Sequence, residues 1–271
     1  MCKRSTTGVQ IRDHHQRAID RLIAAYRDDP RFRALIIGGS VAKGCARTDS
    51  DVDFLIVATD ETYERHRAAR GLFINRRDLC DYDGGFVDGK IINLAFLADL
   101  EKKGNEPSRA AFEGAFTAFS HVPNLDALLQ RIPVYLEAGH DERIRVFYSM
   151  AFMQHWLVHE AERHRNSYAL IRAASQLALF TGRLILAHNR RLFRYHKWLP
   201  RALGSAPDKP VDLMSRFNVL LREPCGDHAT ALFERVRCFR DWRVTDLEAY
   251  TWFMTDVEWS WMSGTTPIED W

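Results

Sequence analysis

The sequence has few cysteines, no long apolar run and little net charge, and each absence excludes a class of protein. Its 271 residues include five cysteines, none of them spaced as Cys-x-x-Cys, which argues against a zinc site or a disulfide scaffold and favours a reducing cytoplasm. No apolar segment approaches the roughly 18 residues that indicate a membrane span, and the first residues contain no apolar core. We therefore expect neither a transmembrane helix nor a signal peptide.

The charges are nearly balanced. The formal net charge is +2, from 38 Lys and Arg against 36 Asp and Glu. Non-specific nucleic-acid binding normally requires a clustered basic excess, so the charge makes no case for such a partner. Hydrophobic residues make up 46% and charged residues 27% of the chain, as in an ordinary globular protein. We expect one large domain or two modest ones, located in the cytoplasm.

Residues 35–57 are the most informative part of the chain. An apolar run ends in Gly-Gly-Ser, and a short spacer separates it from Asp-Val-Asp, which opens a second apolar run. The glycines allow a tight turn, and Ser40 would lie where a strand gives way to a helix, beside unpaired N–H groups that favour anions. Asp51 and Asp53 alternate along a predicted strand, so both carboxylates point to one face and suit Mg²⁺, which prefers oxygen ligands and substrate phosphates.

This stretch resembles the nucleotidyltransferase superfamily to which DNA polymerase β belongs. The motif of that family is an apolar strand, Gly-Gly or Ser-Ser, a spacer, and then Asp-h-Asp or Asp-h-Glu, where h is apolar. The matching positions here are Gly39, Ser40, Asp51 and Asp53. The resemblance implies transfer of a nucleoside monophosphate from a nucleoside triphosphate, ATP by default, to an acceptor hydroxyl. The alternative is a surface turn before an ordinary strand that begins with two aspartates.

The apolar pattern predicts an α+β domain over residues 1–138, with a mixed β-sheet and flanking helices, followed by an all-α helical bundle over 139–271. Superfamily members that modify small molecules, including the aminoglycoside nucleotidyltransferases, often have this layout. In the first domain the expected helices cover 9–28, 61–71 (capped by Asp60) and 124–131, with another after Asn105, and the expected strands cover 32–37, 53–58, 86–87 and 91–97, with a short one near Ala118. In the second domain helical spacing covers 141–191, 211–222, 227–241 and 244–262, with a loop marked by Pro200.

The acid set of the predicted site is incomplete. The family usually supplies a third carboxylate from a neighbouring strand, but the expected strand over 91–97 contains Asn93, a neutral oxygen donor, and no acid. Asp88 precedes a glycine in a predicted hairpin turn, where an aspartate requires no functional explanation. Three alternatives stay open: a site with two acids, a third acid from elsewhere, or a weak or inactive enzyme. In aminoglycoside-type relatives a glutamate of the helical domain is the general base, and the candidates here are Glu160 and Glu162, either of which could instead be a solvated helix residue.

Basic residues in both predicted domains are candidates for phosphate binding. Lys43 and Arg47 lie in the motif spacer, and Arg194 and Lys197 lie in a basic and aromatic run before Pro200, where they could hold the β- and γ-phosphates. The alternatives are a solvated turn for the first pair and cations near a helix C-terminus for the second. The candidate nucleotide-binding residues are Gly38, Gly39, Ser40, Lys43, Arg194 and Lys197.

Two functions of different classes remain. The first is a cytoplasmic, Mg²⁺-dependent nucleotidyltransferase that acts on a small molecule, with antibiotics among the candidate acceptors. The second is a protein-modifying or catalytically weak, antitoxin-like nucleotidyltransferase that acts as a regulatory binding partner. The long helical domain favours the first, because free-standing antitoxins of this type are usually short. The missing third acid favours the second, and the sequence leaves a homodimer open.

Overall fold

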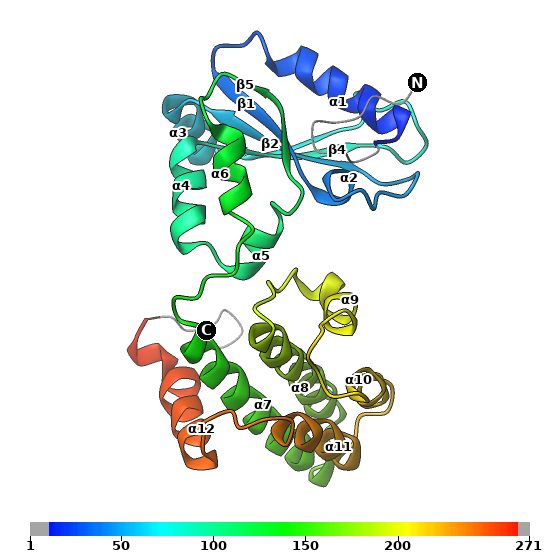
Figure 1. Ribbon diagram of the computed structural model, residues 1–271, viewed down its shortest axis with the longest axis vertical. Helices are drawn as coiled ribbons and strands as arrows, with labels where there is room; N and C mark the ends of the chain where they lie inside the picture. Colours follow the sequence, from blue (N-terminus) through cyan, green and yellow to red (C-terminus); the bar gives the residue numbers. More distant parts are fainter. Residues whose placement is uncertain (1–10, 265–271) are drawn as a thin grey trace. The chain divides into compact units, whose positions relative to one another are not determined.

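The computed structural model describes residues 11–264 of the chain. The chain divides into two compact units, Met1–Val134 and Tyr135–Trp271, and each unit has its own hydrophobic core (Figure 1). The first unit contains every strand found in the described residues, and the second is helical. This confirms the predicted fold class, a mixed sheet with helices followed by a helical region.

The first unit is built on a five-stranded sheet with the order β3-β4-β2-β1-β5. β2 and β4 run parallel, whereas the pairs β1/β2, β1/β5 and β3/β4 are antiparallel. The strands are β1 Phe32–Ile37, β2 Val52–Ala58, β3 Phe73–Arg76, β4 Val87–Ile92 and β5 Phe116–Ser120. The sequence missed β3.

Both faces of this sheet carry apolar side chains. Phe54 and Ile56 of β2 belong to one buried cluster with residues of α1 (Asp13–Tyr26), while Val57 of the same strand belongs to another with residues of α4 (Leu94–Lys103) and α6 (Leu125–Arg131). The alternation of side chains along a strand produces this separation into two clusters. The shorter helices of the unit are α2 Gly39–Ala42, α3 Asp60–Ala68 and α5 Glu106–Ala110.

The hairpin predicted at Asp88-Gly89 is wrong, because both residues lie inside the continuous strand β4. Gly89 is required for packing rather than for a turn, since a Cβ at this position would overlap the ring of Phe54 on the neighbouring strand. The chain reverses earlier, between β3 and β4, where Gly84 has a positive φ of 72°. Asp88 is therefore a strand residue, and its partner on β2 is Asp53.

The strand predicted over 91–97 is also wrong beyond Ile92. Asn93 is the N-cap of α4, and its side-chain oxygen accepts a hydrogen bond from Phe96 N at 2.9 Å. Its amide nitrogen donates to the Asp60 carboxylate at 2.9 Å, so both polar atoms of the Asn93 side chain have hydrogen-bond partners. Asp60 does not cap α3 as predicted; Thr59 does, by accepting from Thr62 N.

The cap predicted for the next helix is confirmed. The side chain of Asn105 accepts a hydrogen bond from Ser108 N at 2.9 Å at the start of α5. Arg109 in the same helix is buried and donates to the carbonyl oxygens of Leu100 and Val134, each at 2.9 Å. It thus ties the end of α4 to the last residue of the first unit.

The second unit is a helical bundle. Its α-helices are α7 His140–Arg163, α8 Ser167–His188, α9 Leu199–Gly204, α10 Leu213–Arg222, α11 Gly226–Arg237 and α12 Asp246–Phe253, with short 3₁₀ or π turns at His196–Trp198, Met254–Glu258 and Ser260–Met262. The helical stretch predicted over 141–191 is two helices, because Asn166 caps α8 by accepting from Ala169 N. Pro200 lies in the first turn of α9 and not in a loop.

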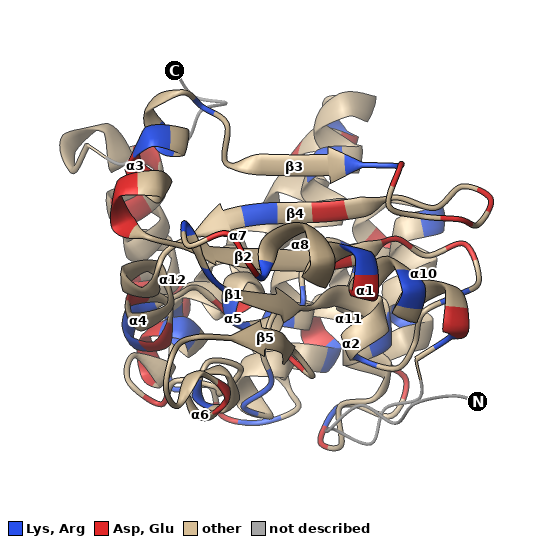
Figure 2. Cartoon of the chain, turned by 90° about the horizontal axis from the view of Figure 1, so that it is seen from above, with Lys and Arg blue, Asp and Glu red and all other residues tan. Residues whose placement is uncertain are grey.

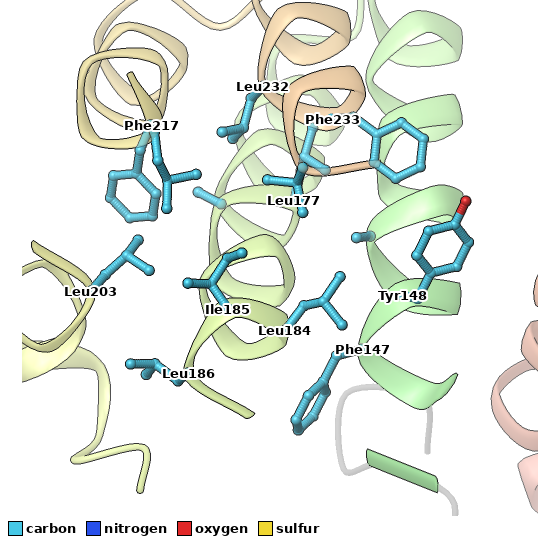
Figure 3. Close-up of a cluster of buried hydrophobic side chains, with 14 of the residues drawn as sticks. Phe147, Tyr148, Leu177, Leu184, Ile185, Leu186, Leu203, Phe217, Leu232 and Phe233 are labelled. Carbon is cyan, nitrogen blue, oxygen red and sulfur yellow. The ribbon is translucent and has the colours of Figure 1, made fainter. Parts of the chain in front are cut away.

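α8 runs through the core of this bundle, where Leu177, Leu184 and Ile185 pack against the surrounding helices (Figure 3). By length and composition α8 could cross a membrane, which the sequence analysis did not expect. Half of its most apolar window is buried inside the bundle, as in the core helix of a soluble protein, so this is weak support for a membrane span.

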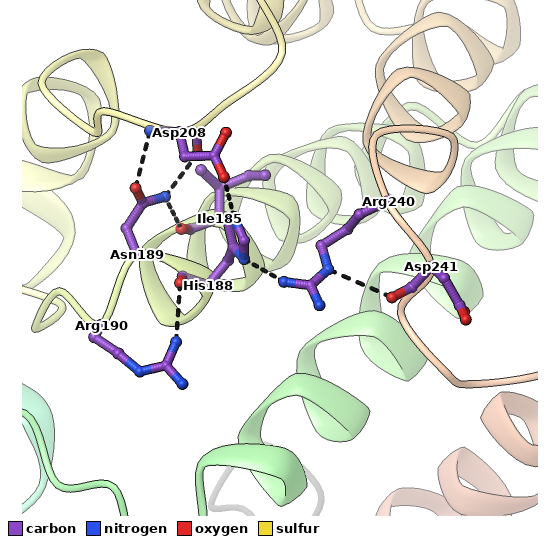
Figure 4. A network of polar contacts seen from close by, with 7 residues as sticks. All are labelled: Ile185, His188, Asn189, Arg190, Asp208, Arg240 and Asp241. Atoms are coloured by element: carbon purple, nitrogen blue, oxygen red, sulfur yellow. Dashed lines mark hydrogen bonds and ion pairs between the residues drawn. The ribbon is translucent and has the colours of Figure 1, made fainter.

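A polar network closes the C-terminal end of α8 (Figure 4). His188 Nε2 lies 2.6 Å from the Asp208 carboxylate, and the guanidinium of Arg240 lies 2.6 Å from His188 Nδ1. Asn189 donates to Ile185 O at 2.8 Å, which satisfies one of the last carbonyl groups of the helix. These contacts join the segments that follow α8 and α11 to the end of the core helix.

Candidate nucleotide and metal site

The Gly-Ser turn lies directly against Asp53. Gly39 begins α2 with a positive φ of 61°, and a Cβ at this position would overlap the Asp53 carboxylate. Gly38 N donates to Asp53 O at 3.0 Å, which holds the turn to β2. Only glycine therefore fits at position 39. The turn after β1 is in direct contact with Asp53 of β2.

The first turn of α2 offers donors to an anion. The earliest intrahelical donors are Ala42 N and Lys43 N, which bond Gly38 O and Gly39 O, so the preceding N–H groups of the turn have no helical acceptor. Ser40 is partly exposed, and its hydroxyl makes no hydrogen bond within residues 11–264. Gly39 of this turn lies against Asp53, and phosphate binding by the turn stays a prediction.

Asp88 completes a group of three acids that the sequence analysis did not recognise. Asp53 in β2 is paired in register with Asp88 in β4. Neighbouring strands lie about 4.8 Å apart, and residues paired across a parallel sheet point to the same face. Asp51 precedes β2 and is two residues from Asp53. The charged residues of β4 are Asp88 and Lys90, separated by Gly89, and Figure 2 shows one acidic and one basic segment on this strand.

The charges of the three acids affect one another. Burial, followed by the negative charges of Asp51 and Asp88, raises the pKa of Asp53 to about 6. Burial also raises the pKa of Asp88, with a further contribution from Asp51, while Lys90 opposes the shift. Such a cluster is unfavourable when ionised near neutral pH, and a bound cation would reverse the effect.

The donor chemistry of this cluster fits Mg²⁺, which the family implies. No three His, Cys, Asp or Glu side chains within residues 11–264 are already arranged around a common metal position. The mutual pKa effects nevertheless place Asp51, Asp53 and Asp88 within electrostatic reach of one another. Since Mg²⁺ keeps several waters and substrate phosphates as ligands, one or two carboxylates are enough to hold it.

The two basic residues of the motif spacer differ in their surroundings. Lys43 Nζ donates to Ala110 O at 3.2 Å, lies 3.8 Å from the Glu113 carboxylate, and contributes to lowering the pKa of Asp53. It is therefore near the acids but held by groups at the end of α5. Arg47 is exposed and paired with Asp49 at 2.9 Å, as expected for a solvated turn. Their phosphate contacts stay a prediction.

The remaining candidates lie in the second unit, near the C-terminal end of α7 and after α8. Glu160 is paired with Arg163, and Glu162 accepts a hydrogen bond from Gly226 N at 3.0 Å at the start of α11. Lys197 Nζ lies 5.5 Å from the centroid of the Trp198 ring, one turn before α9. The roles predicted for Glu160, Glu162, Arg194 and Lys197 are untested by these contacts.

The two glutamates lie near the C-terminal end of α7, and the two basic residues follow α8 in the chain. Arg190, just after α8, is paired with Glu137, just before α7, at 3.0 Å, which shows that the helices are antiparallel neighbours. A helix rises 1.5 Å per residue, so the ends of the 24-residue α7 lie about 36 Å apart. The segment after α8 runs back beside that helix, because Leu199 lies against Gly182, so Lys197 is nearer to Glu160 than this length.

Sequence comparison identifies the class of the first unit. Residues 20–111 match the family described as "Nucleotidyltransferase domain", and this range contains the Gly-Ser turn and all three acids. Residues 20–111 are therefore similar to a nucleotidyltransferase domain, as the motif predicted.

A solved structure supports the same fold. The crystal structure of a nucleotidyltransferase-like protein from Exiguobacterium sibiricum is similar with a TM-score of 0.50, over 92% of this chain and 79% of that chain. The two chains are 9% identical, so this likeness concerns the fold alone. No curated protein matches the chain.

Proposed function

We propose that this protein transfers a nucleoside monophosphate from a nucleoside triphosphate, ATP by default, to a hydroxyl of a small molecule, with Mg²⁺ held by Asp51 and Asp53. The observation that carries the proposal is the register pairing of Asp53 with Asp88 beside the Gly39 turn. In-line nucleotidyl transfer requires metal ions that stabilise the attacking and leaving oxygens, and this cluster supplies the charge to hold them.

Each site residue of the first unit then has a separate task. The hydroxyl of Ser40 and the first N–H groups of α2 bind oxygens of the triphosphate beside Asp53. Asp88, whose pKa is raised by burial, takes the proton of the acceptor hydroxyl while the new oxygen–phosphorus bond forms and pyrophosphate leaves. Among the alternatives that the sequence left open, we favour a third acid supplied by the neighbouring strand.

The test combines binding and transfer. Calorimetry with Mg²⁺ and ATP should show loss of nucleotide affinity for Asp51→Asn and Asp53→Asn. Transfer of labelled nucleotide to a panel of hydroxyl-bearing small molecules, antibiotics included, should fall by about 10²–10⁴-fold for Asp88→Asn with binding retained. Asp83→Asn, which removes one exposed charge from the loop before β4, is the matched control. Parental Mg²⁺-nucleotide affinity in both Asp51→Asn and Asp53→Asn would refute the proposal.

The antitoxin-like alternative depended on the missing third acid, and the position of Asp88 weakens that argument. It is the conclusion to draw if the parent protein transfers nucleotide to no small molecule but modifies or binds a purified partner protein. We propose a cytoplasmic location from the scattered cysteines and the nearly balanced charge, with no membrane partner. A homodimer stays a proposal, to be tested by sedimentation.

A further inference from the structure

The carbonyl group of Ser50, the residue before Asp51, receives two hydrogen bonds from distant parts of the first unit. His15 Nε2, in the first turn of α1, lies 3.0 Å from this oxygen. The hydroxyl of Tyr82, in the connection between β3 and β4, donates to it at 2.7 Å. A carbonyl oxygen has two lone pairs, and both are used here.

Asp51 needs such support because it lies outside the sheet. Asp53 is within β2, between β1 and β4, but β2 begins only at Val52. On the following side of Asp51, Val52 N donates to Phe86 O at 3.1 Å. On the preceding side, the peptide unit is planar, so anchoring the Ser50 carbonyl also orients the Asp51 N–H and restricts the Asp51 backbone.

The surroundings of His15 indicate that its role is this hydrogen bond and not packing alone. Its ring is fully buried, and Nδ1 has no hydrogen-bond partner within residues 11–264. Burial and the neighbouring His14 lower the pKa of His15, which favours the neutral ring. A carbonyl accepts only, so Nε2 carries the single N–H. An apolar residue would fill the same space without leaving a buried nitrogen unpartnered.

Aromatic contacts hold the two donors in place. The His15 and Tyr82 rings meet edge to face with centroids 5.3 Å apart, and His14 contacts both, at 4.2 and 4.5 Å. The three rings thus form a packed group that joins α1 to the β3–β4 connection beside Ser50.

We propose that His15 and Tyr82 are positioning residues for the nucleotidyltransferase site, which fix the Asp51 carboxylate next to Asp53 through the Ser50 carbonyl. The inference rests on the proposed function, because the two residues are assigned the role of supporting metal binding by Asp51. Groups that orient metal ligands typically contribute about 10- to 100-fold to metal affinity.

The experiment uses Mn²⁺ as the probe. The ion is titrated into the full chain, and the free ion is measured by its electron paramagnetic resonance signal. Tyr82→Phe keeps the ring and removes one donor, and should weaken Mn²⁺ binding by about 10-fold. His15→Leu removes the other donor, and His15→Gln, which retains an N–H, should recover affinity relative to it. Tyr26→Phe, an aromatic residue of α1 that packs on Phe32 and Phe54, is the matched control. Thermal unfolding of each variant separates loss of binding from loss of fold.

The outcomes distinguish the inference from the proposed function. If Tyr82→Phe and His15→Leu are folded and bind Mn²⁺ as the parent does, while Asp51→Asn does not, the positioning role is overturned and the proposed function stands. If Asp51→Asn binds as the parent does, the proposed function fails and the positioning role fails with it. Tyr82→Phe, which loses a single hydroxyl, decides the question should His15→Leu not fold.

Discussion

Replacing Asp53 by asparagine is expected to stabilise the first unit in metal-free buffer at neutral pH, although it removes a metal ligand. Asp53 is largely buried, and burial together with the charges of Asp51 and Asp88 raises its pKa from 3.8 to about 6. Asparagine has nearly the same size and no charge. The substitution therefore removes an electrostatic cost while it leaves the packing against Gly39 unchanged.

The sign and size of the effect follow from linkage. The carboxyl group holds its proton more tightly in the folded chain, so its favourable contribution is complete below pH 3.8 and is lost as the pH rises through about 6. The difference between the two pKa values corresponds to about 3 kcal/mol. We expect Asp53→Asn to raise the free energy of unfolding by about 3 kcal/mol at pH 7.5 and by about 1 kcal/mol at pH 4.5.

The assay must report on the first unit alone. All seven tryptophans lie beyond residue 150, so their fluorescence follows the second unit and is an internal control. Amide hydrogen exchange of the β1 and β2 peptides against urea gives the free energy of the first unit. Added Mg²⁺ should stabilise the parent and not Asp53→Asn, and Asp83→Asn should behave as the parent does.

Two results would refute this reasoning. A variant less stable than the parent at pH 7.5 in metal-free buffer would show that the Asp53 charge is not a cost to the folded state. A gain that is equal at pH 7.5 and pH 4.5 would show that the gain comes from packing rather than from ionisation.

Three further predictions concern single side chains. Gly39→Val places a branched Cβ into the Asp53 carboxylate and should abolish Mg²⁺-nucleotide binding in calorimetry. Parental affinity in this variant would show that the Gly39 turn does not bind phosphate. Gly89→Ala pushes a methyl group into the Phe54 ring and should destabilise the first unit by about 1–3 kcal/mol in the exchange assay, whereas a turn glycine would tolerate alanine at lower cost. Glu162→Gln weakens the bond to the start of α11 and should lower the stability of the second unit by about 1 kcal/mol, read by tryptophan fluorescence. Full nucleotide transfer in both Glu160→Gln and Glu162→Gln would remove these residues as the general base.

The parts of the fold that depend on local pattern were predictable. The apolar run Phe32–Ile37 that ends before two glycines is β1 with the predicted bounds, and the apolar run after Asp51 and Asp53 correctly indicated β2. The Gly-Ser turn between them follows from the same local signals. Its contact with Asp53 also agrees with the motif, because the turn and the second strand are close in sequence.

The third acid was not predictable from such signals. The dipeptide Asp88-Gly89 is a strong turn signal in isolation, and the reason for glycine here is the ring of Phe54, a distant residue that only the pairing of β2 with β4 brings near. One local signal does exist in the sequence: the uncharged residues Val87, Gly89 and Ile91 alternate with the charged residues Asp88 and Lys90, which is the alternation of a strand.

The end of β4 shows the same conflict between two local patterns. Leu94, Leu97 and Leu100 recur at a helical spacing, which competes with the strand-like run of apolar residues that precedes them. The hydrogen bond from Phe96 N to Asn93 decides in favour of the helix. Residues after Asn93 therefore contribute to the core around α4 and not to the start of β2 and β4, where the acids lie.

The contacts of the two glutamates bear on what the second unit can add to catalysis. Glu160 pairs with Arg163, and Glu162 accepts a hydrogen bond from Gly226 N at the start of α11. Both glutamates therefore already have partners within the second unit. Under the proposed function Asp88 is the third acid, and the glutamates would then not be needed to complete the chemistry. Phosphate binding by Arg194 and Lys197 stays a prediction.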